Sequence, residues 1–468
     1  MSYLNPALNL PPGPEENVLV SDLKKDSLGV LLRYTRNYGD IVHYRAESWL
    51  VILVNHPNYI KHVLQEKHHN YTKEGTPDLM MLKPMLGEGL MTSEGESWFQ
   101  QRRLIQPAFH RERIEAFSTA ITDATQSMLQ QWKTVGDRGN PLEITQEMTR
   151  LTLKVIAQVL FGVDLSCEAD NFGQLVGVIN EYMANFDPSN QYLRHQFQLA
   201  RTTLNRLVYK IIQERRCQNE DKEDLLSMLM LAQDEKTQER MSDRQLHDQV
   251  FTMLMAGHET TAKALTWTLY LLDQHPTVAR QLQNELAVVL GGRTPTCQDI
   301  PNLTYTWMVI QESMRLYPPV WLMSRLCRTD DEIGGYHIPA NTLVLISPYA
   351  MHRHPSFWQE PERFNPERFR PEVVVERLPY TYLPFSGGQR QCIGLILARM
   401  ETLLVLATLA QQYQLRLIPN HPVEPEALVT LRPRFGLPMT VHSLKTQLVV
   451  PSTQAEAKKQ GDVENVSV

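Results

Sequence analysis

Residues 385–394 read FSGGQRQCIG, in which three glycines surround Cys392 just before a long run of helix-forming residues. A cysteine at the start of a helix faces unpaired backbone N–H groups and the positive end of the helix dipole, and both stabilise the thiolate that binds metals. Gly387 and Gly388 are predicted to let the backbone fold tightly beneath a flat ligand, and Gly394 to let the helix approach it without a Cβ in the way. The segment therefore predicts a metal-binding thiolate beside a macrocycle.

The same ten residues match the pattern F-x-x-G-x-R-x-C-x-G at every defined position, and this pattern resembles the haem-binding loop of the cytochromes P-450. The resemblance implies haem b, iron protoporphyrin IX, with the sulfur of Cys392 bound to the iron and with Phe385, Arg390 and Gly394 around the haem. In that family the thiolate pushes electron density to the iron and favours O–O cleavage. A lone cysteine is more often buried and inert. The matched positions favour the haem ligand here.

A second segment, residues 250–272, has the pattern of a long buried helix interrupted by the small and polar residues AGHETT. Ala256 and Thr260 are four apart, so the Thr260 hydroxyl can bond to the carbonyl of residue 256 and open a local bulge. The segment resembles A-G-x-[DE]-T-[TS] of the family's central helix. This implies that Glu259 and Thr260 are catalytic and deliver protons to iron-bound dioxygen, and that Ala256 contacts the haem. A capped kink in a core helix is the alternative.

Two charged motifs follow later in the chain. Glu312 and Arg315 are three apart on one helix face, where they can pair and meet a third charged group, although E-x-x-R alone usually marks a surface pair. With the later FNPERF they resemble two family elements, which implies a structural triad of Glu312, Arg315 and Arg368 that braces the cysteine loop. Arg368 is preferred to Arg363 of the first PERF copy, because the family has an aromatic residue and a proline just before the motif.

Four further side chains are predicted to bind the haem. Trp98 and Arg102 are four apart on a predicted helix and can both donate to an anionic oxygen, a spacing similar to the family's propionate-binding W-x-x-x-R. Arg390 in the cysteine loop and Arg325, ten residues after Arg315, occupy the other positions where the family often has propionate-binding arginines. Each arginine alone is typical of a solvated surface. Their joint spacing favours the propionate sites.

Most of the remaining chain has helical periodicity, broken by short β-branched runs. The predicted helices include 196–216, 222–234 and the apolar stretch after Gly394, and the predicted strands include 41–44, 50–54 and 342–346. The expected fold is mainly α with small β-sheets, and the resemblance implies the cytochrome P-450 fold, a triangular helical prism around a buried haem. We expect a proline-rich lead-in over residues 1–19, one haem-thiolate domain over 20–445 and a polar tail over 446–468.

The chain has 468 residues, 42% hydrophobic and 21% charged, as in a globular protein with a sizeable core. Its net charge of −6 gives no global basic field, so nucleic acid is not an expected partner. No stretch approaches the roughly 18 apolar residues of a membrane span, and the first residues lack a signal-peptide pattern, so we expect a cytoplasmic monomer without an integral membrane segment. The five cysteines are an odd number without C-x-x-C spacing, which argues against disulfides and a structural zinc site.

The resemblance implies a monooxygenase that activates O2 with two electrons and hydroxylates a lipophilic substrate. No flavin or nicotinamide fingerprint is present, so a ferredoxin or flavodoxin with its reductase is expected to dock near the cysteine loop and Arg102–Arg103. The YPPV and AFH segments are similar to the cyanobacterial and fatty-acid-hydroxylating branches of a soluble bacterial type. Long-chain fatty acids are the first expected substrate class and terpenes are the second. Substrate contacts are expected from residues 78–92, 178–200, 319–323 and the face around Ala256.

Two other functions stay open. A haem-thiolate peroxygenase or isomerase would need neither external electrons nor an acid–alcohol pair, so Glu259 and Thr260 favour dioxygen activation over it. A non-enzymatic haem sensor or electron carrier is the other alternative, and it would be expected to have an output module, which the sequence does not reveal.

Overall fold

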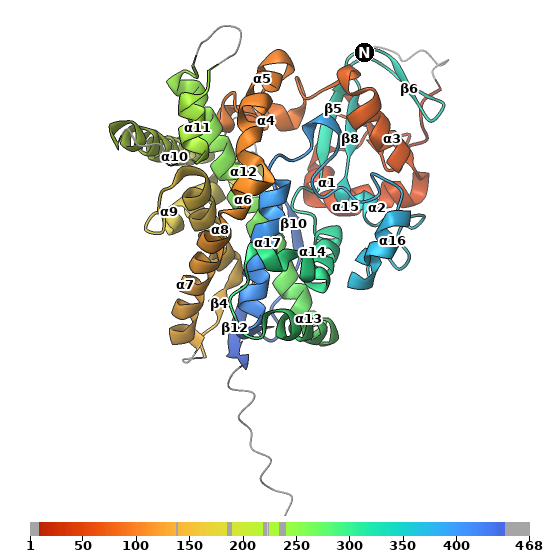
Figure 1. Cartoon of the computed structure of the whole chain (residues 1–468). Helices are drawn as coiled ribbons and strands as arrows, with labels where there is room; N and C mark the ends of the chain where they lie inside the picture. The colour runs from red at the N-terminus through yellow and green to blue at the C-terminus, as the bar shows by residue number, and fades with distance from the viewer. Residues whose placement is uncertain are drawn as a thin grey trace, which may run out of the picture.

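The computed structural model describes residues 9–136, 139–184, 190–218, 222, 224–233 and 240–444. Helices dominate the molecule, and the strands of the largest sheet gather to one side of them (Figure 1). This is the mainly helical fold with small sheets that the sequence predicts.

The largest sheet has its strands in the order β1-β2-β8-β5-β3. They are β1 (Ile41–Ala46), β2 (Trp49–Val54), β8 (Leu343–Ile346), β5 (Met323–Cys327) and β3 (Tyr71–Thr72). β2 and β8 pair in parallel and the other neighbours pair antiparallel. Alternate side chains of β2 enter two separate apolar clusters, with Ile52 in one and Leu53 in the other. Because both faces of the sheet are covered, the central strands are nearly continuous apolar runs, and the sequence identifies them for that reason.

The helical region is built around α12 (Asp243–Gln274). It packs against α8 (Ile144–Phe161), α10 (Gln191–Gln218), α14 (Thr304–Leu316) and α17 (Leu395–Ala410), several of which surround it in Figure 1. α12 starts before the predicted residue 250 because Ser242 and Gln245 form a capping box at its N-terminus. From Leu246 to Leu272 almost all of its side chains are buried. A polar residue on this helix therefore needs a partner or an internal space.

α17 begins directly after Gly394, as predicted, and is buried along most of its length because it is apolar around its circumference. The helix predicted at 196–216 is α10, which extends further at both ends, and the one predicted at 222–234 is the shorter α11 (Leu225–Leu231). The other α-helices are α1 (Val20–Lys25), α2 (Ser27–Tyr38), α3 (Pro57–Lys61), α4 (Pro77–Leu86), α5 (Gly95–Ile105), α6 (Arg111–Glu115), α7 (Ser118–Gly136), α9 (Ala169–Ala184), α13 (Pro276–Leu290), α15 (Pro348–Met351) and α16 (Pro371–Glu376). Short 3-10 and π turns are η1 (His62–Glu66), η2 (His68–Asn70), η3 (Gln106–Phe109), η4 (Cys297–Asn302), η5 (Pro366–Phe369) and η6 (Gly388–Arg390).

Smaller sheets complete the described part of the fold. They are β4 (Leu142–Glu143), β12 (Pro438–Ser443) and β9 (Tyr413–Leu417) in that order, β6 (Asp331–Ile333) with β7 (Tyr336–Ile338), and β10 (Pro425–Ala427) with β11 (Leu431–Pro433).

The proline-rich lead-in lies against the sheets. The N–H of His43 donates to the carbonyl of Pro12 (2.9 Å), and Nδ2 of Asn9 donates to the carbonyl of Gly335 (2.8 Å). The first eight residues of this segment and the predicted polar tail, residues 446–468, lie outside the described residues. In the part of the chain that is described, no helix combines the length and apolar character needed to cross a membrane.

Candidate functional site

Cys392 lies in the short loop between η6 and α17. Its N–H donates to the carbonyl of Phe385 (3.0 Å), and the N–H of Gly394 donates to its sulfur. Burial raises the pKa of the Cys392 thiol, while the Gly394 N–H and the Arg102 guanidinium oppose this rise. A thiolate here therefore needs a bound cation to stabilise it. The side chain is nevertheless accessible. A sulfur that is enclosed by protein and still accessible faces an internal space.

The glycines of this loop differ in what they adjoin. A Cβ at Gly388 would lie 1.9 Å from the carbonyl oxygen of Leu64 in η1, and one at Gly387 would lie 2.4 Å from the Tyr380 ring. These two glycines thus allow the loop to pack closely against other parts of the protein. This corrects the role predicted from the sequence, which was to let the backbone fold beneath a flat ligand. Gly388 also has a φ of +66°, which favours glycine. A Cβ at Gly394 would meet nothing closer than 3.9 Å, so the space beside this glycine is open.

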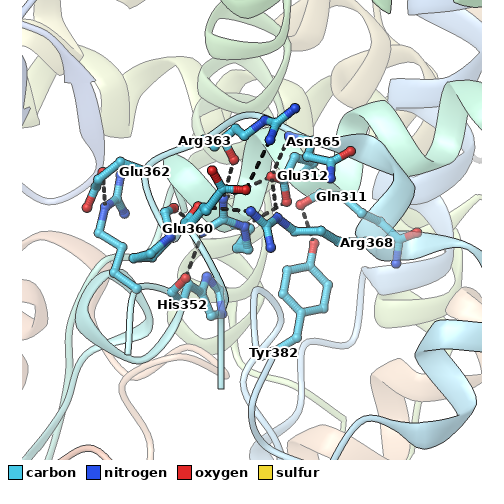
Figure 2. Close-up of polar contacts among 12 residues, drawn as sticks. Gln311, Glu312, His352, Glu360, Glu362, Arg363, Asn365, Arg368 and Tyr382 are labelled. Atoms are coloured by element: carbon cyan, nitrogen blue, oxygen red, sulfur yellow. Dashed lines mark hydrogen bonds and ion pairs between the residues drawn. The ribbon is translucent and has the colours of Figure 1, made fainter. Parts of the chain in front are cut away.

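Glu312 and Arg315 form a fully buried ion pair on α14, and Figure 2 labels Glu312 among its polar neighbours. Nε and Nη2 of Arg315 donate to the two carboxylate oxygens of Glu312 at 2.7 and 2.9 Å. Its Nη1 donates to the carbonyl oxygens of His352 (2.9 Å) and Pro361 (2.7 Å). Buried charges are stable only when they are paired and hydrogen-bonded, and this pair meets both conditions.

Arg368 joins this pair, as predicted, and Arg363 does not. Nε of Arg368 lies 3.4 Å from Oε1 of Glu312, whereas the Arg363 guanidinium lies 3.0 Å from the exposed carboxylate of Glu360. Arg363 takes part only through its backbone carbonyl, which accepts from Nη2 of Arg315 at 3.2 Å. Figure 2 shows both arginines near Glu312. The two PERF copies therefore make different contacts with the same ion pair. We call Glu312, Arg315 and Arg368 the brace.

Two side chains that the sequence analysis did not single out connect the brace to the segment leading into the cysteine loop. Nε2 of His352 accepts from the N–H of Leu383 (3.0 Å), and the hydroxyl of Tyr382 donates to the carbonyl of Gln311 (2.9 Å; Figure 2). Burial and the neighbouring charge of Arg315 hold the pKa of His352 well below its usual value. Its ring is therefore neutral, which leaves Nε2 free to accept.

The predicted propionate residues lie on α5, in the cysteine loop and, for Arg325, on β5. Cζ of Arg390 lies 4.4 Å from the ring centroid of Trp98, and Nη2 of Arg390 donates to Oε1 of Glu94 (2.6 Å). Nη1 of Arg102 donates to the carbonyl of Gln391, next to the cysteine, at 3.0 Å. α5 and the loop are thus joined by the side chains that the sequence predicts to act together.

Arg325 and Lys73 add two buried cations to this group. Burial lowers the pKa of Arg325, and burial with the nearby charges of Arg325 and Arg390 lowers the pKa of Lys73 to about 8. The carboxylates that act on these cations are Asp78 and Glu94. Three cations against two carboxylates leave a positive excess, which fits a ligand with anionic groups. Lys73 has no motif around it, so the sequence analysis missed it.

The predicted Thr260 contact is present on α12, where Oγ1 donates to the carbonyl of Ala256 at 2.8 Å. α12 stays α-helical through these residues, so the predicted local bulge does not form in this helix. Ala256 and Thr260 are both partly accessible, although Met255 and Glu259 beside them are buried. Since α12 lies inside the helical region, this accessibility indicates an internal space along the face that Ala256 and Thr260 share.

Glu259 is held by side chains from two other segments. Its Oε1 accepts from Nδ2 of Asn180 in α9 (2.8 Å) and from the hydroxyl of Thr430 beside β11 (2.8 Å). One turn further on, burial lowers the pKa of Lys263, and the charge of Glu259 opposes this. Asn180 and Thr430 are distant from Glu259 in sequence, and no signal in the sequence could have found them.

An accessible enclosed thiol, a buried positive cluster and an accessible stripe on α12 are the features that a planar, anionic, iron-containing macrocycle needs. α12 and α17 pack against each other, so the stripe and the thiol belong to neighbouring elements. The residues present therefore fit a haem group.

Comparisons with known proteins agree with this fit. Residues 11–439 match the family model for cytochrome P450. The chain is 36% identical to cyclooctatin synthase of Streptomyces melanosporofaciens over 84% of this chain and 87% of that protein. It is 36% identical to cyclooctat-9-en-7-ol 5-monooxygenase of the same organism, over 82% and 84%. Its fold is similar to the crystal structure of the cytochrome P450DA haem domain, with a TM-score of 0.85, 26% identity and coverage of 93% of this chain and 98% of that one.

Proposed function

Because the chain belongs to the cytochrome P450 family and is a haem-dependent monooxygenase, we propose that it binds haem b through Cys392 and hydroxylates a terpene. The observation that carries the proposal is the sulfur of Cys392, which is enclosed and yet accessible, in a loop that matches the family's at every defined position.

In the proposed complex, the chain holds haem from three sides. The Cys392 sulfur binds the iron, and Ala256 leaves room beside the ring. The propionates are received by Trp98, Arg102, Arg325, Arg390 and Lys73. When bound, haem supplies the redox chemistry that inserts one oxygen atom of O2 into a C–H bond. The protein adds a fixed ligand, compensated charges and a dry pocket.

Glu259 and Thr260 move protons in this proposal. The Thr260 hydroxyl is anchored to the Ala256 carbonyl and presents its oxygen to the internal space, while Asn180 and Thr430 fix the Glu259 carboxylate. A positioned acid–base group of this kind contributes about 10²–10⁴-fold to a rate. A peroxygenase or isomerase would not need the pair, and for this reason we favour O2 with external electrons.

The substrate proposal rests on the relatives. The sequence alone ranks long-chain fatty acids first and terpenes second, whereas the similar Streptomyces proteins are terpene-modifying enzymes, which reverses that order. Both classes are lipophilic, as expected of segments rich in Met and Leu such as 78–92. A rigid polycyclic substrate also loses less conformational freedom on binding than a long chain does.

The proposed electron donor is an acidic ferredoxin or flavodoxin that docks beside the cysteine loop. Arg103 and Arg399 are exposed on α5 and α17, on the elements that flank this loop. Arg399 lies 5.0 Å from the Trp307 ring, and its pKa is lowered by burial and by the charge of Arg111. Gathered positive charge steers an acidic partner and speeds its association.

The central test is the absorption spectrum of the reduced protein under carbon monoxide, beside the Cys392→Ser variant. We expect a red-shifted Soret band that the variant loses while its far-UV circular dichroism is unchanged. A histidine-type band in well-folded wild-type protein would contradict thiolate ligation.

Substrate and oxidant are tested separately on the haem-loaded protein. Cyclic terpenes should shift the Soret band, and with a surrogate ferredoxin chain they should take up ¹⁸O from labelled O2. A response to fatty acids alone would overturn the terpene proposal and leave the monooxygenase intact. Turnover with peroxide but not with the electron chain would favour the peroxygenase.

A further inference from the structure

The turn formed by residues 87–92, between α4 and α5, is bound to the N-terminal half of α12. The N–H of Glu88 donates to Oδ2 of Asp248 (2.9 Å), and the N–H of Leu90 donates to Oε1 of Gln249 (3.1 Å). Neither contact serves the chemistry described above. Two adjacent residues of one helix thus hold alternate backbone N–H groups of the same turn.

The turn also approaches α12 too closely for side chains at its glycines. A Cβ at Gly87 would lie 2.2 Å from the Asp248 carboxylate, and one at Gly89 would lie 2.1 Å from Oγ1 of Thr252. The hydrogen bonds and the close packing together define the position of this backbone.

The far end of the turn leads to the positive cluster. The carbonyl of Met91 accepts from Nζ of Lys73 (2.5 Å), and that of Ser93 accepts from Nη2 of Arg390 (3.0 Å). Nε2 of Gln101 on α5 donates to the carbonyl of residue 88 at 2.9 Å. The turn is therefore held between α12 on one side and the proposed haem-binding residues on the other.

One stripe of α12 connects this turn to the proposed chemistry. Asp248, Thr252, Ala256 and Thr260 recur every four residues and form one inclined ridge along the helix, which we call the α12 face. Its first half holds the turn and its second half is the partly accessible Ala256–Thr260 stretch. Thr252 and Ala256 are four residues apart, or about 6 Å along the helix. The turn thus contacts α12 about one helical turn from the first partly accessible residue of the internal space.

Asp248 is itself oriented from a third element. Its Oδ1 lies 3.0 Å from Nδ1 of His247, and the His247 ring stacks on Tyr209 of α10 with centroids 4.4 Å apart. Asp248 and His247 are both buried. A buried carboxylate that is used on both oxygens has a defined orientation, so it can define the position of what it binds.

We propose that Asp248 and Gln249 are positioning residues for substrate specificity: by holding the turn 87–92, they fix the wall formed by Leu90 and Met91 and thereby decide which substrates fit. Leu90 packs into the main core and Met91 is half-buried against it. The inference rests on the proposed function, because it concerns the pocket of the same site. A looser turn enlarges the pocket without changing the haem ligand or the proton-delivery pair.

The first test uses amide hydrogen exchange in the haem-loaded protein to measure how strongly α12 protects the backbone amides of the turn. Asp248→Ala should speed exchange at least tenfold in peptides that contain the Glu88 and Leu90 amides, and Asp248→Asn, which keeps an acceptor oxygen, should restore protection. Asp243→Ala, at an exposed aspartate of the same helix, is the matched control and should leave this turn unchanged. Equal exchange in all variants would overturn the proposal.

The second test measures pocket size by the haem spectral shift with imidazole and with bulky phenyl-substituted imidazoles. In Asp248→Ala the affinity for imidazole should stay constant and that for the bulky ligands should change at least fivefold. Constant affinity for every ligand, despite faster exchange, would reduce the turn to a structural role and overturn the inference. Gln249→Leu is the second variant should Asp248→Ala fail to fold. If no thiolate-type spectrum forms at all, the proposed function fails. The exchange test still measures whether Asp248 protects the amides of the turn.

Discussion

The charged atoms of Glu312 and Arg315 are fully buried and all engaged, whereas α12 leaves Oγ1 of Thr252 and Nε2 of His258 buried without a partner among the described residues. The Glu312–Arg315 pair thus satisfies its own hydrogen bonds before any ligand arrives. α12, in whose middle Ala256 and Thr260 are partly accessible, keeps hydrogen-bonding capacity for water or ligand. The first arrangement suits a scaffold, and the second suits a reaction site.

This difference predicts two kinds of damage. A change in the brace leaves an uncompensated buried charge, so it should affect folding and haem retention together. A change at Thr260 alters a hydroxyl whose hydrogen bond among the described residues stays within its own helix, so it should affect turnover in protein that still holds haem.

Glu312→Ala should have the largest effect. Removing the carboxylate leaves Arg315 buried and unpaired, which costs about 3–5 kcal/mol of folding free energy. We expect the variant to retain little haem, measured as the Soret-to-protein absorbance ratio, and to unfold at lower temperature. Glu360→Ala is the control, because Glu360 is 60% exposed and pairs only at the surface. A haem-loaded Glu312→Ala protein with normal unfolding would break the contrast.

Thr260→Ala should keep its haem and lose productive turnover by about 10²-fold, because proton delivery contributes on that scale. The measurement is product formed per nicotinamide cofactor oxidised, with the carbon monoxide spectrum as the check on the haem. Thr266→Ala is a close control, since Thr266 lies on the same helix and also donates to the carbonyl four residues earlier. Equal losses in both variants would mean that the hydroxyl of Thr260 only stabilises the helix.

The same two regions show what a sequence can predict. Glu312 with Arg315, and Ala256 with Thr260, are three and four residues apart, so helical geometry alone brings them together. Helix existence was predicted for the same reason, while the start of α12 was not, because its cap at Ser242 lies outside the apolar pattern.

Contacts between distant segments could be predicted only where a family motif marks both partners, as for Arg368 and Glu312. Leu383 with His352, and Glu259 with Asn180, join elements that only the folded chain brings together. The predicted roles of Gly387 and Gly388 were wrong for a related reason: whether a glycine faces a ligand or a neighbouring protein group depends on packing that no local pattern encodes. Gly388, which lies against Leu64, is the example.

The variants Arg368→Ala and Arg363→Ala compare the two copies of the PERF motif. The Arg368 side chain is 12% exposed and faces Glu312, whereas that of Arg363 is 64% exposed. We expect Arg368→Ala to lower the free energy of unfolding by about 1–3 kcal/mol and Arg363→Ala to change it by no more than about 0.5 kcal/mol. Chemical denaturation of the two variants measures the difference. Equal effects would show that the third position of the brace is not specific to Arg368.

The smallest predicted effect is the pH dependence that His352 gives to the brace. Burial and the charges of Arg315 and Arg353 hold its pKa well below the usual 6.5, so the folded protein keeps the ring neutral where the unfolded chain binds a proton. Below pH 6.5 the unfolded state therefore binds more protons, and the stability due to this residue falls by up to about 1.4 kcal/mol per pH unit until the folded pKa is reached.

The variant His352→Gln tests this dependence, because its amide oxygen can still accept the Leu383 N–H but the side chain does not titrate. Denaturation between pH 5 and 7 should therefore give a shallower slope in the variant than in the wild type, and the other buried histidines cancel because both proteins contain them. Identical slopes would mean that His352 is not kept neutral, and that the link between the brace and the cysteine loop does not depend on Nε2 accepting the Leu383 N–H.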